Sequence, residues 1–360
     1  MSSGMGGPLP RVLAPATFLA ARVYGAVVAA RNTAFDAQRG VHTLTVKGVR
    51  IPVISVGNIT SGGTGKSPFV AWLCGELAQM GMHPVIAMRG YRPHKDVGSN
   101  ELFSDEAREY ATTAPSATVV VGARRHEALT MRLGQSDCDA WRARAVVVLD
   151  DGFQHRALSR NLDIVLVDTT RPGLAGDVLP HGWLREPAKN LARADLVVLT
   201  KVAMGDGAVD GSHAATVAAA ELVRSTRGAL PDACCAHHWS ALDVYQDGVA
   251  RSESVQWLAS QRVAICCGLG NPKQFEASVR AAAGAIVRTW ALPDHRALTA
   301  SALESVLQLP GEAQACVISR KDLVKLDRLP AMTLVVPKLE LVFDDGVKRL
   351  RAAVRRVVSA

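Results

Sequence analysis

Thr60-Ser-Gly-Gly-Thr-Gly-Lys-Ser67 is the stretch of sequence that decides the fold. A short apolar run at 53–57 precedes it and a stretch of helical character, 66–80, follows it, which is the setting that a phosphate-binding loop requires. In such a loop, backbone N–H groups turn towards the phosphates of a nucleotide, a lysine reaches the β- and γ-phosphates, and a hydroxyl binds Mg²⁺. Thr60 stands where the usual pattern has glycine. The predicted nucleotide-binding residues are Gly62, Gly63, Thr64, Gly65, Lys66 and Ser67.

Uniformly apolar runs alternate with helical stretches through the first part of the chain. The runs lie at 53–57, 84–88, 118–121, 145–149, 164–167 and 196–199. Because they are apolar throughout rather than at every second residue, they suit a parallel sheet covered on both faces. Their alternation with helices indicates an α/β fold. We therefore predict a P-loop NTPase-like, mostly parallel sheet with helices on both faces.

A phosphate-loop protein needs a second element, an apolar strand that ends in an acid able to hold Mg²⁺. Val146-Val-Val-Leu-Asp-Asp151 supplies it, and Gly-Phe-Gln-His155 follows directly. Two acids, a turn glycine, an amide and an imidazole in succession are unusual for a structural turn, so we predict Asp150 and Asp151 as metal ligands. The similar run 163–168 competes, but we expect Asp168 to cap the end of its strand.

The nucleoside is indicated by a partial motif after a late strand. A guanine-specific site would carry Asn/Thr-Lys-x-Asp there. The sequence Thr200-Lys201-Val202-Ala203 begins in this way but has alanine in place of the aspartate that reads guanine. We therefore expect ATP rather than GTP.

The N-terminal stretch 12–30 is largely apolar, and arginines flank or interrupt it. Pro15 and Arg22 count against a membrane-spanning helix. Two interpretations remain equally open from this stretch alone: a helix lying in the membrane interface and an ordinary amphipathic helix docked on the protein. A second set of apolar runs, 263–267, 286–292, 316–319 and 333–336, precedes a basic helix at 346–358. We predict an N-terminal membrane-interface helix over 1–45, a P-loop core over 46–215 and a smaller C-terminal α/β domain over 216–360.

Composition narrows the class of partner. The chain of 360 residues carries 41 Lys+Arg against 33 Asp+Glu, a net charge of +8, which favours an anionic partner such as a nucleotide or an acidic membrane surface. Aromatic residues make up only 5%, which counts against nucleic acid. The seven cysteines include no C-x-x-C, so we expect neither a disulfide framework nor a cysteine zinc site.

Further motifs complete a family pattern. They are Gly57-Asn-Ile-Thr-Ser-Gly-Gly-Thr-Gly-Lys-Ser-Pro68, Arg89-Gly-Tyr91, Ser104-Asp-Glu106, Asp150-Asp-Gly-Phe-Gln-His155, Leu184-Arg-Glu-Pro187, Gly268-Leu-Gly-Asn-Pro272, Asp294-His295 and Lys321-Asp322. In this order, from about residue 10 to 330, the chain resembles the tetraacyldisaccharide 4′-kinase, or lipid A 4′-kinase, family. The threonine at position 60 is shared by that family. Arg320 stands where the family usually has glutamate, so no role of that acid carries over.

The resemblance implies an ATP-dependent lipid kinase. The implied reaction moves the γ-phosphoryl group of ATP, with Mg²⁺, to the 4′-hydroxyl of a tetraacylated glucosamine disaccharide 1-phosphate, giving lipid IVA. The implied location is the cytoplasmic face of the bacterial inner membrane, where the N-terminal helix touches the membrane surface and the protein is peripheral. We expect no nucleic acid and no stable protein partner.

The resemblance also implies roles for individual residues. Asp105 matches the family's candidate base, and His295 matches the histidine that partners it. An aspartate held by a histidine can be oriented and tuned to take a proton. Lys66 is the third catalytic residue. The implied nucleotide site also includes Arg185, and the implied metal ligands are Ser67, Asp150, Asp151 and Glu186.

Two other classes of protein remain as alternatives. A metal-insertion or maturation ATPase would share a glycine-rich phosphate loop on a similar sheet, but it would need Cys or His pairs at ligand spacing, which His237-His238 and the cysteine pairs do not supply. A non-enzymatic membrane-associated binding module would account for the basic helix and the apolar N-terminal stretch, but it gives Lys66, Asp150 and Asp151 no purpose. Detection of a phosphorylated lipid would separate the three.

Overall fold

The computed structural model describes residues 14–90, 94–95, 102–103, 105–202, 212–269, 272–292, 298–307 and 313–359. The chain forms two compact units. The first consists of Met1–Arg92, Thr113–Ala236 and Leu341–Ala360, and the second of Pro93–Thr112 and His237–Glu340. The chain therefore passes between the units after residues 92, 112, 236 and 340.

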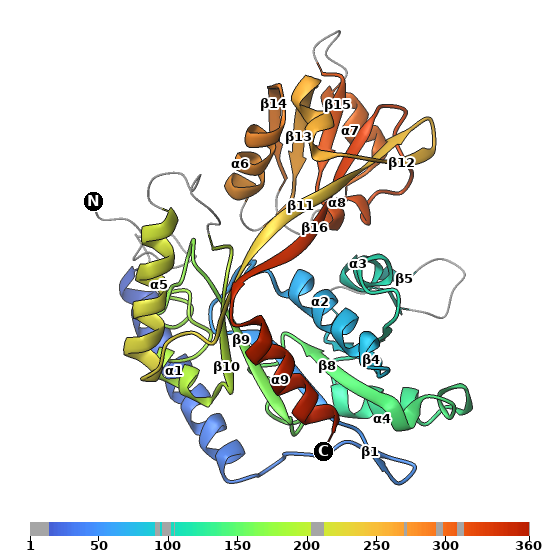
Figure 1. Ribbon diagram of the computed structural model, residues 1–360. Helices are drawn as coiled ribbons and strands as arrows, with labels where there is room; N and C mark the ends of the chain where they lie inside the picture. The colour runs from blue at the N-terminus through green and yellow to red at the C-terminus, as the bar shows by residue number, and fades with distance from the viewer. Residues whose placement is uncertain are drawn as a thin grey trace. The chain divides into compact units, whose positions relative to one another are not determined.

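A parallel sheet forms the centre of the first unit (Figure 1). The strands lie in the order β10-β9-β3-β8-β4-β7, and each neighbouring pair is parallel. The start of β11 (Ala233–Gln246) adds a further parallel partner to β10. The other six strands are β3 (Val53–Asn58), β4 (His83–Met88), β7 (Thr118–Val121), β8 (Ala145–Asp150), β9 (Leu162–Asp168) and β10 (Leu196–Thr200).

The order of the strands determines where a ligand can bind. One side of β3 carries β8, β4 and β7, and the other side carries β9, β10 and β11. The strand order therefore reverses beside β3. In open parallel sheets, ligands bind at the carboxyl ends of the strands next to such a reversal, which is where the stretch 59–67 begins.

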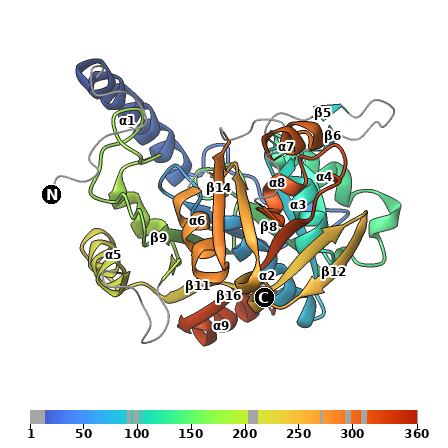
Figure 2. The same cartoon turned by 90° about the horizontal axis from the view of Figure 1, so that it is seen from above.

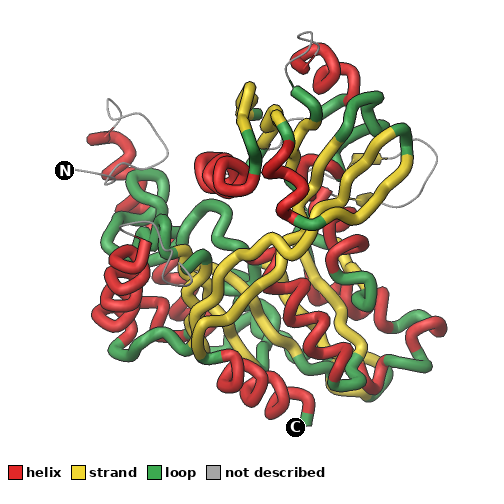
Figure 3. The backbone as a smooth tube through the Cα atoms, turned by 45° about the horizontal axis from the view of Figure 1, so that its top comes forward, coloured by secondary structure: helices red, strands yellow, loops and turns green. Residues whose placement is uncertain are grey.

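Helices cover both faces of this sheet, as Figures 1 and 3 show. One face packs against α4 (Arg125–Leu133) and α5 (Ser212–Arg227) through two clusters of buried aliphatic residues. On the opposite face, α2 (Lys66–Gln79) packs on β3, β4 and β8, and α9 (Val347–Val358) packs on β9. Every residue of β3, β8, β9 and β10 is buried. The predicted α/β fold with a parallel, doubly covered sheet is confirmed.

The helix α1 (Ala14–Asp36) belongs to the first unit. Its buried residues are Thr17, Ala21, Val28 and Asn32, whose spacing of four or seven places them on one side of the helix. Figure 2 shows α1 beside the loops that follow β9. Among the described residues, none of the helices has both the length and the apolar character that crossing a membrane demands.

Most strand pairs of the second unit are parallel. Strand β13 pairs with β14 and β15, and β15 pairs with β16, all parallel. Strand β12 is antiparallel to β11. The elements are α3 (Asp105–Thr113), β12 (Val249–Glu253), β13 (Arg262–Cys267), α6 (Pro272–Ala282), β14 (Ala285–Ala291), α7 (Ala300–Leu307), β15 (Ala315–Ile318), α8 (Arg320–Leu323) and β16 (Leu334–Asp345).

Short elements complete both units. The hairpin of β1 (Thr45–Val46) and β2 (Val49–Arg50) is antiparallel, as is the pair β5 (His94–Lys95) and β6 (Leu102–Phe103). The 3₁₀ helices are η2 (Ser136–Cys138), η3 (Arg142–Arg144), η4 (Ala188–Arg193) and η5 (Val255–Ser260).

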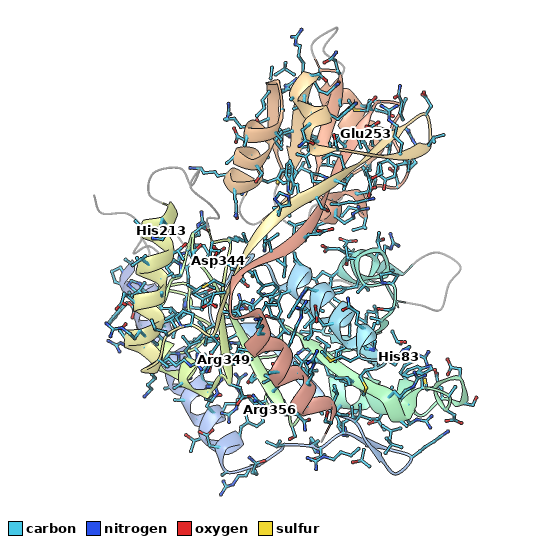
Figure 4. All side chains as sticks on the ribbon, viewed as in Figure 1. His83, His213, Glu253, Asp344, Arg349 and Arg356 are labelled. Atoms are coloured by element: carbon cyan, nitrogen blue, oxygen red, sulfur yellow. The ribbon has the colours of Figure 1, made fainter. Side chains whose placement is uncertain are left out.

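The two units differ from the predicted division at 45 and 215. The N-terminal helix is part of the first unit because one side of it is buried there. The basic helix α9 also returns to the first unit, since Leu350, Val354 and Val357 are buried and Arg351 pairs with Glu76 of α2 at 2.7 Å. Figure 4 labels Arg349 and Arg356 on this helix. Conversely, residues 93–112 group with the second unit.

Candidate phosphate-loop site

The loop 59–65 leaves β3 through a tightly packed turn. A Cβ atom on Gly57 would lie 2.5 Å from the backbone nitrogen of Phe153, so only glycine fits there. Gly62 and Gly65 have φ angles of +123° and +81°, which glycine adopts readily and other residues rarely do. The helix α2 begins at Lys66, directly after this turn. The backbone N–H groups at its first turn therefore lie next to the loop, as an anion site requires.

Lys66 is held from two sides at the start of α2. Its Nζ donates a hydrogen bond to Asn58 Oδ1 at 3.2 Å and lies 3.4 Å from Asp151 Oδ1. Asn58 is itself buried, and its Nδ2 donates to the carbonyl of Thr60 at 2.6 Å. The ammonium group is thus held in place by the end of β3 and by the residue after β8.

Asp151 collects three positive charges. Arg185 donates to both of its carboxylate oxygens, at 2.7 and 2.6 Å, Lys66 lies opposite, and Arg125 donates to its carbonyl oxygen at 3.3 Å. Burial alone would raise the pKa of Asp151, but Lys66 and Arg185 outweigh it and lower the pKa to about 2. The φ angle of Asp151 is +53°, a conformation that non-glycine residues rarely adopt and that is common at functional sites.

Asp150, the last residue of β8, is buried beside α2. Burial and the nearby Asp150 carboxylate raise the pKa of Cys74, on α2, to about 12. Ser67 lies in the first turn of the same helix. Among the described residues, no three His, Cys, Asp or Glu side chains are grouped so that they could hold a metal ion.

This donor set fits Mg²⁺ and not a metal enclosed by protein ligands alone. Mg²⁺ in proteins takes one or two carboxylates together with phosphate oxygens and water. Asp150, Asp151 and the Ser67 hydroxyl supply hard oxygen donors around the start of α2. The predicted set is therefore chemically suitable, apart from Glu186.

Glu186 is fully buried, and its carboxylate is already occupied. Arg193 pairs with both oxygens, at 2.8 and 3.1 Å, and three amide groups donate to it as well. These amides belong to Asn32, Gln154 and Asn190. Direct metal binding would require Glu186 to release donors from four side chains, whereas Asp151 would have to release only the Arg185 guanidinium, so Glu186 is the least suited of the predicted ligands. It holds Gln154 instead.

The segment 183–187 runs antiparallel beside the phosphate loop. Ser61 donates its backbone N–H to the carbonyl of Trp183 at 2.7 Å, and Arg185 donates its own to the carbonyl of Ile59 at 2.8 Å. These two bonds bring Arg185 to Asp151. Gln154 closes the arrangement, because its Nε2 donates both to the Asn58 carbonyl and to Glu186.

Lys201 and Asp168 support the loop from the ends of β10 and β9. Lys201 Nζ donates to the carbonyl of Gly63 and to Asp168. Asp168 also accepts hydrogen bonds from the N–H and hydroxyl of Thr170, at 2.9 and 2.6 Å, which is the strand-end cap that we predicted. Thr200 Oγ1 donates to the Thr64 carbonyl. The partial guanine motif thus contributes a lysine that holds the phosphate loop.

Several residues of this site were missed by sequence reasoning. Arg125 belongs to no motif that we quoted, and only its position at the start of α4 could have indicated it. Asn58, the last residue of β3, lies within the quoted phosphate-loop motif, but without a role. Lys201 was noted, but only as part of an incomplete guanine motif. Gln154 lies within a motif that we quoted, without a role.

Two further residues, Asp105 and His295, are predicted to act on the proton of the acceptor hydroxyl. Asp105 is the first residue of α3 and belongs to the second unit. It is partly exposed. His295 lies outside the described residues. Their roles therefore stay predictions.

Comparison with known proteins identifies the family. The family model described as tetraacyldisaccharide-1-P 4′-kinase matches residues 11–358. The tetraacyldisaccharide 4′-kinase of Chlorobium chlorochromatii is 32% identical over 350 residues, which cover 93% of this chain and 88% of that protein. The enzyme of the same name from Anaeromyxobacter dehalogenans is 35% identical over 339 residues, covering 89% and 83%.

The fold agrees with that of a solved structure. LpxK from Aquifex aeolicus, crystallised in complex with ATP, superposes with a TM-score of 0.68 at 24% sequence identity, covering 96% of this chain and 98% of that one. At this identity the likeness concerns the fold. The match of the family model over nearly the whole chain, together with the two relatives, shows that this chain belongs to the tetraacyldisaccharide-1-phosphate 4′-kinase family.

Proposed function

We propose that this protein catalyses the reaction after which its family is named. It transfers the γ-phosphoryl group of ATP to the 4′-hydroxyl of a tetraacylated glucosamine disaccharide 1-phosphate and so forms lipid IVA. The observation that carries this proposal is the position of Lys66, held by Asn58 and Asp151 at the first turn of α2 in a chain that matches the family throughout.

The residues of the loop act mainly by placing charge. The backbone around Gly62–Gly65 and the start of α2 bind the phosphates of ATP, and Lys66 lies where it neutralises negative charge on the transferred group. Asp150, Asp151 and Ser67 would hold Mg²⁺, which when bound offsets charge on the phosphate oxygens. Arg185 keeps the Asp151 carboxylate ionised and oriented.

The acceptor hydroxyl must lose its proton as the new O–P bond forms. We assign this step to Asp105, with His295 holding the aspartate in position, as in the family pattern. Phosphoryl transfer passes through a loose transition state, so the main requirement is that the base lies within hydrogen-bond reach of the hydroxyl.

A membrane surface supplies the acceptor. On the side of α1 opposite its buried residues, Leu19, Val23 and Val27 expose 61–68% of their area. Arg22 and Arg31 are also exposed on this helix. Apolar residues flanked by arginines are typical of helices that lie in a membrane interface with anionic lipids. We therefore assign the protein to the cytoplasmic face of the inner membrane, as a peripheral protein.

The activity is tested with the purified full-length chain. ATP labelled at the γ-phosphate, Mg²⁺ and the tetraacylated disaccharide 1-phosphate are expected to give a labelled lipid on thin-layer chromatography. An acceptor without the 4′-hydroxyl serves as the substrate control and must stay unlabelled. Lys66→Ala should abolish labelling of the normal acceptor, because it removes the ammonium from the loop. Labelled lipid from the 4′-deoxy acceptor would contradict the assigned position of transfer.

The membrane assignment has its own test. We expect the triple variant Leu19→Ser, Val23→Ser, Val27→Ser to bind vesicles of anionic phospholipid several-fold more weakly in a flotation assay, since it removes the exposed apolar side of α1. Val217→Ser, on the exposed side of α5, is the matched control. Equal binding by the triple variant and the control would refute a surface role for α1.

A further inference from the structure

Two hydrogen bonds join the side chains of α1 to the segment beside the phosphate loop. Tyr24 Oη donates to the carbonyl of Arg185 at 2.7 Å. Asn32 Nδ2 donates to Glu186 Oε2 at 3.1 Å. Tyr24 and Asn32 lie two helical turns apart, so α1 contacts adjacent residues of this segment from two points along its length.

Burying the polar side chain of Asn32 costs free energy, and a helix that only docks on the protein would not need it. It is 7% exposed and lies in line with Ala21 and Val28 on the buried side of α1. Within the part of the chain that the structure describes, its Oδ1 is buried without a hydrogen-bond partner. An apolar side chain of similar size would bury here without that cost. The buried asparagine at position 32 is therefore better explained by its hydrogen bond to the Glu186 carboxylate than by docking of the helix.

From Glu186, a chain of hydrogen bonds leads to Lys66. Glu186 Oε1 accepts from Gln154 Nε2 at 3.0 Å, and the same Nε2 donates to the Asn58 carbonyl at 2.9 Å. Asn58 Oδ1 in turn accepts from Lys66 Nζ. Asn58 ends β3 and Lys66 begins α2, so the chain of bonds reaches both ends of the phosphate loop.

A second path starts from Arg185. Its carbonyl is held by Tyr24, and its guanidinium donates to both carboxylate oxygens of Asp151. Asp151 lies 3.4 Å from Lys66 Nζ. The two paths thus start at two points on α1 and end at one ammonium group.

We propose that Tyr24 and Asn32 are positioning residues of the phosphate site. They fix Arg185 and Glu186, which in turn fix Asp151 and Gln154, and so α1 helps to set where Lys66 lies. This inference rests on the proposed function, and it makes α1 more than a surface anchor. Because the opposite side of the helix carries the exposed apolar residues, contact with a lipid surface and placement of the catalytic lysine involve the same helix.

The sharpest variant is Asn32→Leu. It removes the donor to Glu186 but keeps the size of the side chain and removes the buried unpaired oxygen, so α1 should dock at least as well as before. Tyr24→Phe removes a single oxygen and keeps the ring. Thr17→Val is the matched control, because the Thr17 hydroxyl bonds to the carbonyl of Ala14 and to His181, each at 3.0 Å, so the change removes a polar group from the same side of α1 without touching the bonds to Arg185 and Glu186.

Two measurements separate positioning from docking. With saturating lipid and ATP, kcat should fall about 10-fold in Asn32→Leu and in Tyr24→Phe, the lower end of the loss seen when outer partners of a metal site are removed. The KM for the lipid should change by less than about twofold in both, and Thr17→Val should keep the wild-type kcat. Without any ligand, amide hydrogen exchange at residues 150–155 should become faster in the two variants and stay unchanged in the control.

Distinct results would overturn the inference. If Asn32→Leu and Tyr24→Phe keep wild-type kcat and exchange, α1 only docks. If they alter only the KM for the lipid or the binding to anionic vesicles, α1 acts only as a surface anchor. If the wild-type protein fails to label the lipid, the proposed function is wrong, and the exchange data on the ligand-free chain still decide whether α1 holds the loop. Should Asn32→Leu fail to fold, Tyr24→Phe provides the same comparison.

Discussion

Lys201 Nζ donates a hydrogen bond to the carbonyl oxygen of Gly63 at 2.7 Å and so joins the end of β10 to the phosphate loop. The same ammonium pairs with Asp168 at 2.5 Å, and both side chains are almost fully buried. The φ angle of Lys201 is +60°, a backbone conformation that costs about 1–3 kcal/mol for a residue other than glycine. This backbone conformation is tolerated because the Lys201 ammonium group is held by two partners, the Gly63 carbonyl and the Asp168 carboxylate.

Replacing Lys201 by methionine is expected to weaken ATP binding. The loop would lose a charge-assisted hydrogen bond, typically about 1.5–3 kcal/mol, so the KM for ATP should rise by about tenfold or more. The KM for the lipid should stay near the wild-type value. Lys189→Met, which removes an exposed lysine from η4, is the control. An unchanged KM for ATP in Lys201→Met would mean that the loop keeps its shape without this support.

Removing the paired acids at the end of β8 is expected to impair the use of Mg²⁺. Asp150→Asn and Asp151→Asn should each lower kcat by about 10²-fold or more, the loss typical of a preorganised charge, and should raise the Mg²⁺ concentration that gives half-maximal rate. Asp168→Asn should leave that concentration unchanged, because Asp168 contacts Thr170 and Lys201. A Mg²⁺ titration of the three variants decides this. A normal response in both Asp150→Asn and Asp151→Asn would place the metal elsewhere.

The role of Asp105 is tested by Asp105→Asn. This change keeps the shape of the side chain but removes its basicity, so kcat should fall by about 10²–10⁴-fold, the usual share of a general base. The KM for ATP should hardly change. His295→Ala should also lower kcat. The double variant should be only slightly less active than the less active single variant, since the effects of groups that act together are not additive. A kcat within about threefold of wild type in Asp105→Asn would remove it from the mechanism.

The stability of the protein should depend on the protonation of His155. Burial and the neighbouring Arg125 and Arg160 lower the pKa of His155 to about 4, whereas a histidine in an unfolded chain titrates near pH 6.5. The unfolded state therefore binds the proton first as the pH falls. The free energy of unfolding should decrease between about pH 6.5 and pH 4 and level off below. Because His155 is partly exposed and solvent screens its neighbours, its contribution should stay well below the roughly 3 kcal/mol of the full pKa difference.

Urea denaturation at a series of pH values measures this effect. His155→Gln should flatten the curve over the same interval, because glutamine does not titrate. His213→Gln, which changes an exposed histidine on α5, should leave the slope as in the wild type. If the wild-type curve is flat between pH 6.5 and 4, His155 is not buried in its neutral form.

The parts of this fold that could be predicted are those that short, continuous stretches of sequence specify. The run Val53–Asn58 and the glycines after it specify a buried strand and a tight turn locally, and the acids after β8 follow the same logic. The family pattern extended this to Arg185 and Glu186. Burial of uniformly apolar strands also predicted the parallel sheet and its two helical layers.

What could not be predicted depends on contacts between distant segments. Nothing near Glu186 in the sequence indicates that Asn32, Gln154 and Arg193 all converge on its carboxylate. The support that Lys201 gives to the phosphate loop could not be predicted for the same reason, because its partner is a backbone carbonyl of a loop 138 residues away. Hydropathy shows that a helix has a buried side, but it does not show which surface buries it, and α9 was assigned to the other domain on that account.

The position of α9 also constrains how the chain can fold during its synthesis. This helix covers β9 in the first unit, with Gly346 at its start packed so closely against Asp232 and Ala233 that no side chain would fit. In the chain, however, α9 comes after the whole stretch 237–340 of the second unit. As the ribosome delivers the polypeptide from its N-terminus, the part of the first sheet that α9 covers, at β9, stays without its final cover until the second unit has emerged. The nascent protein therefore exposes apolar surface on β9 during that part of its translation, when a chaperone would protect it most effectively.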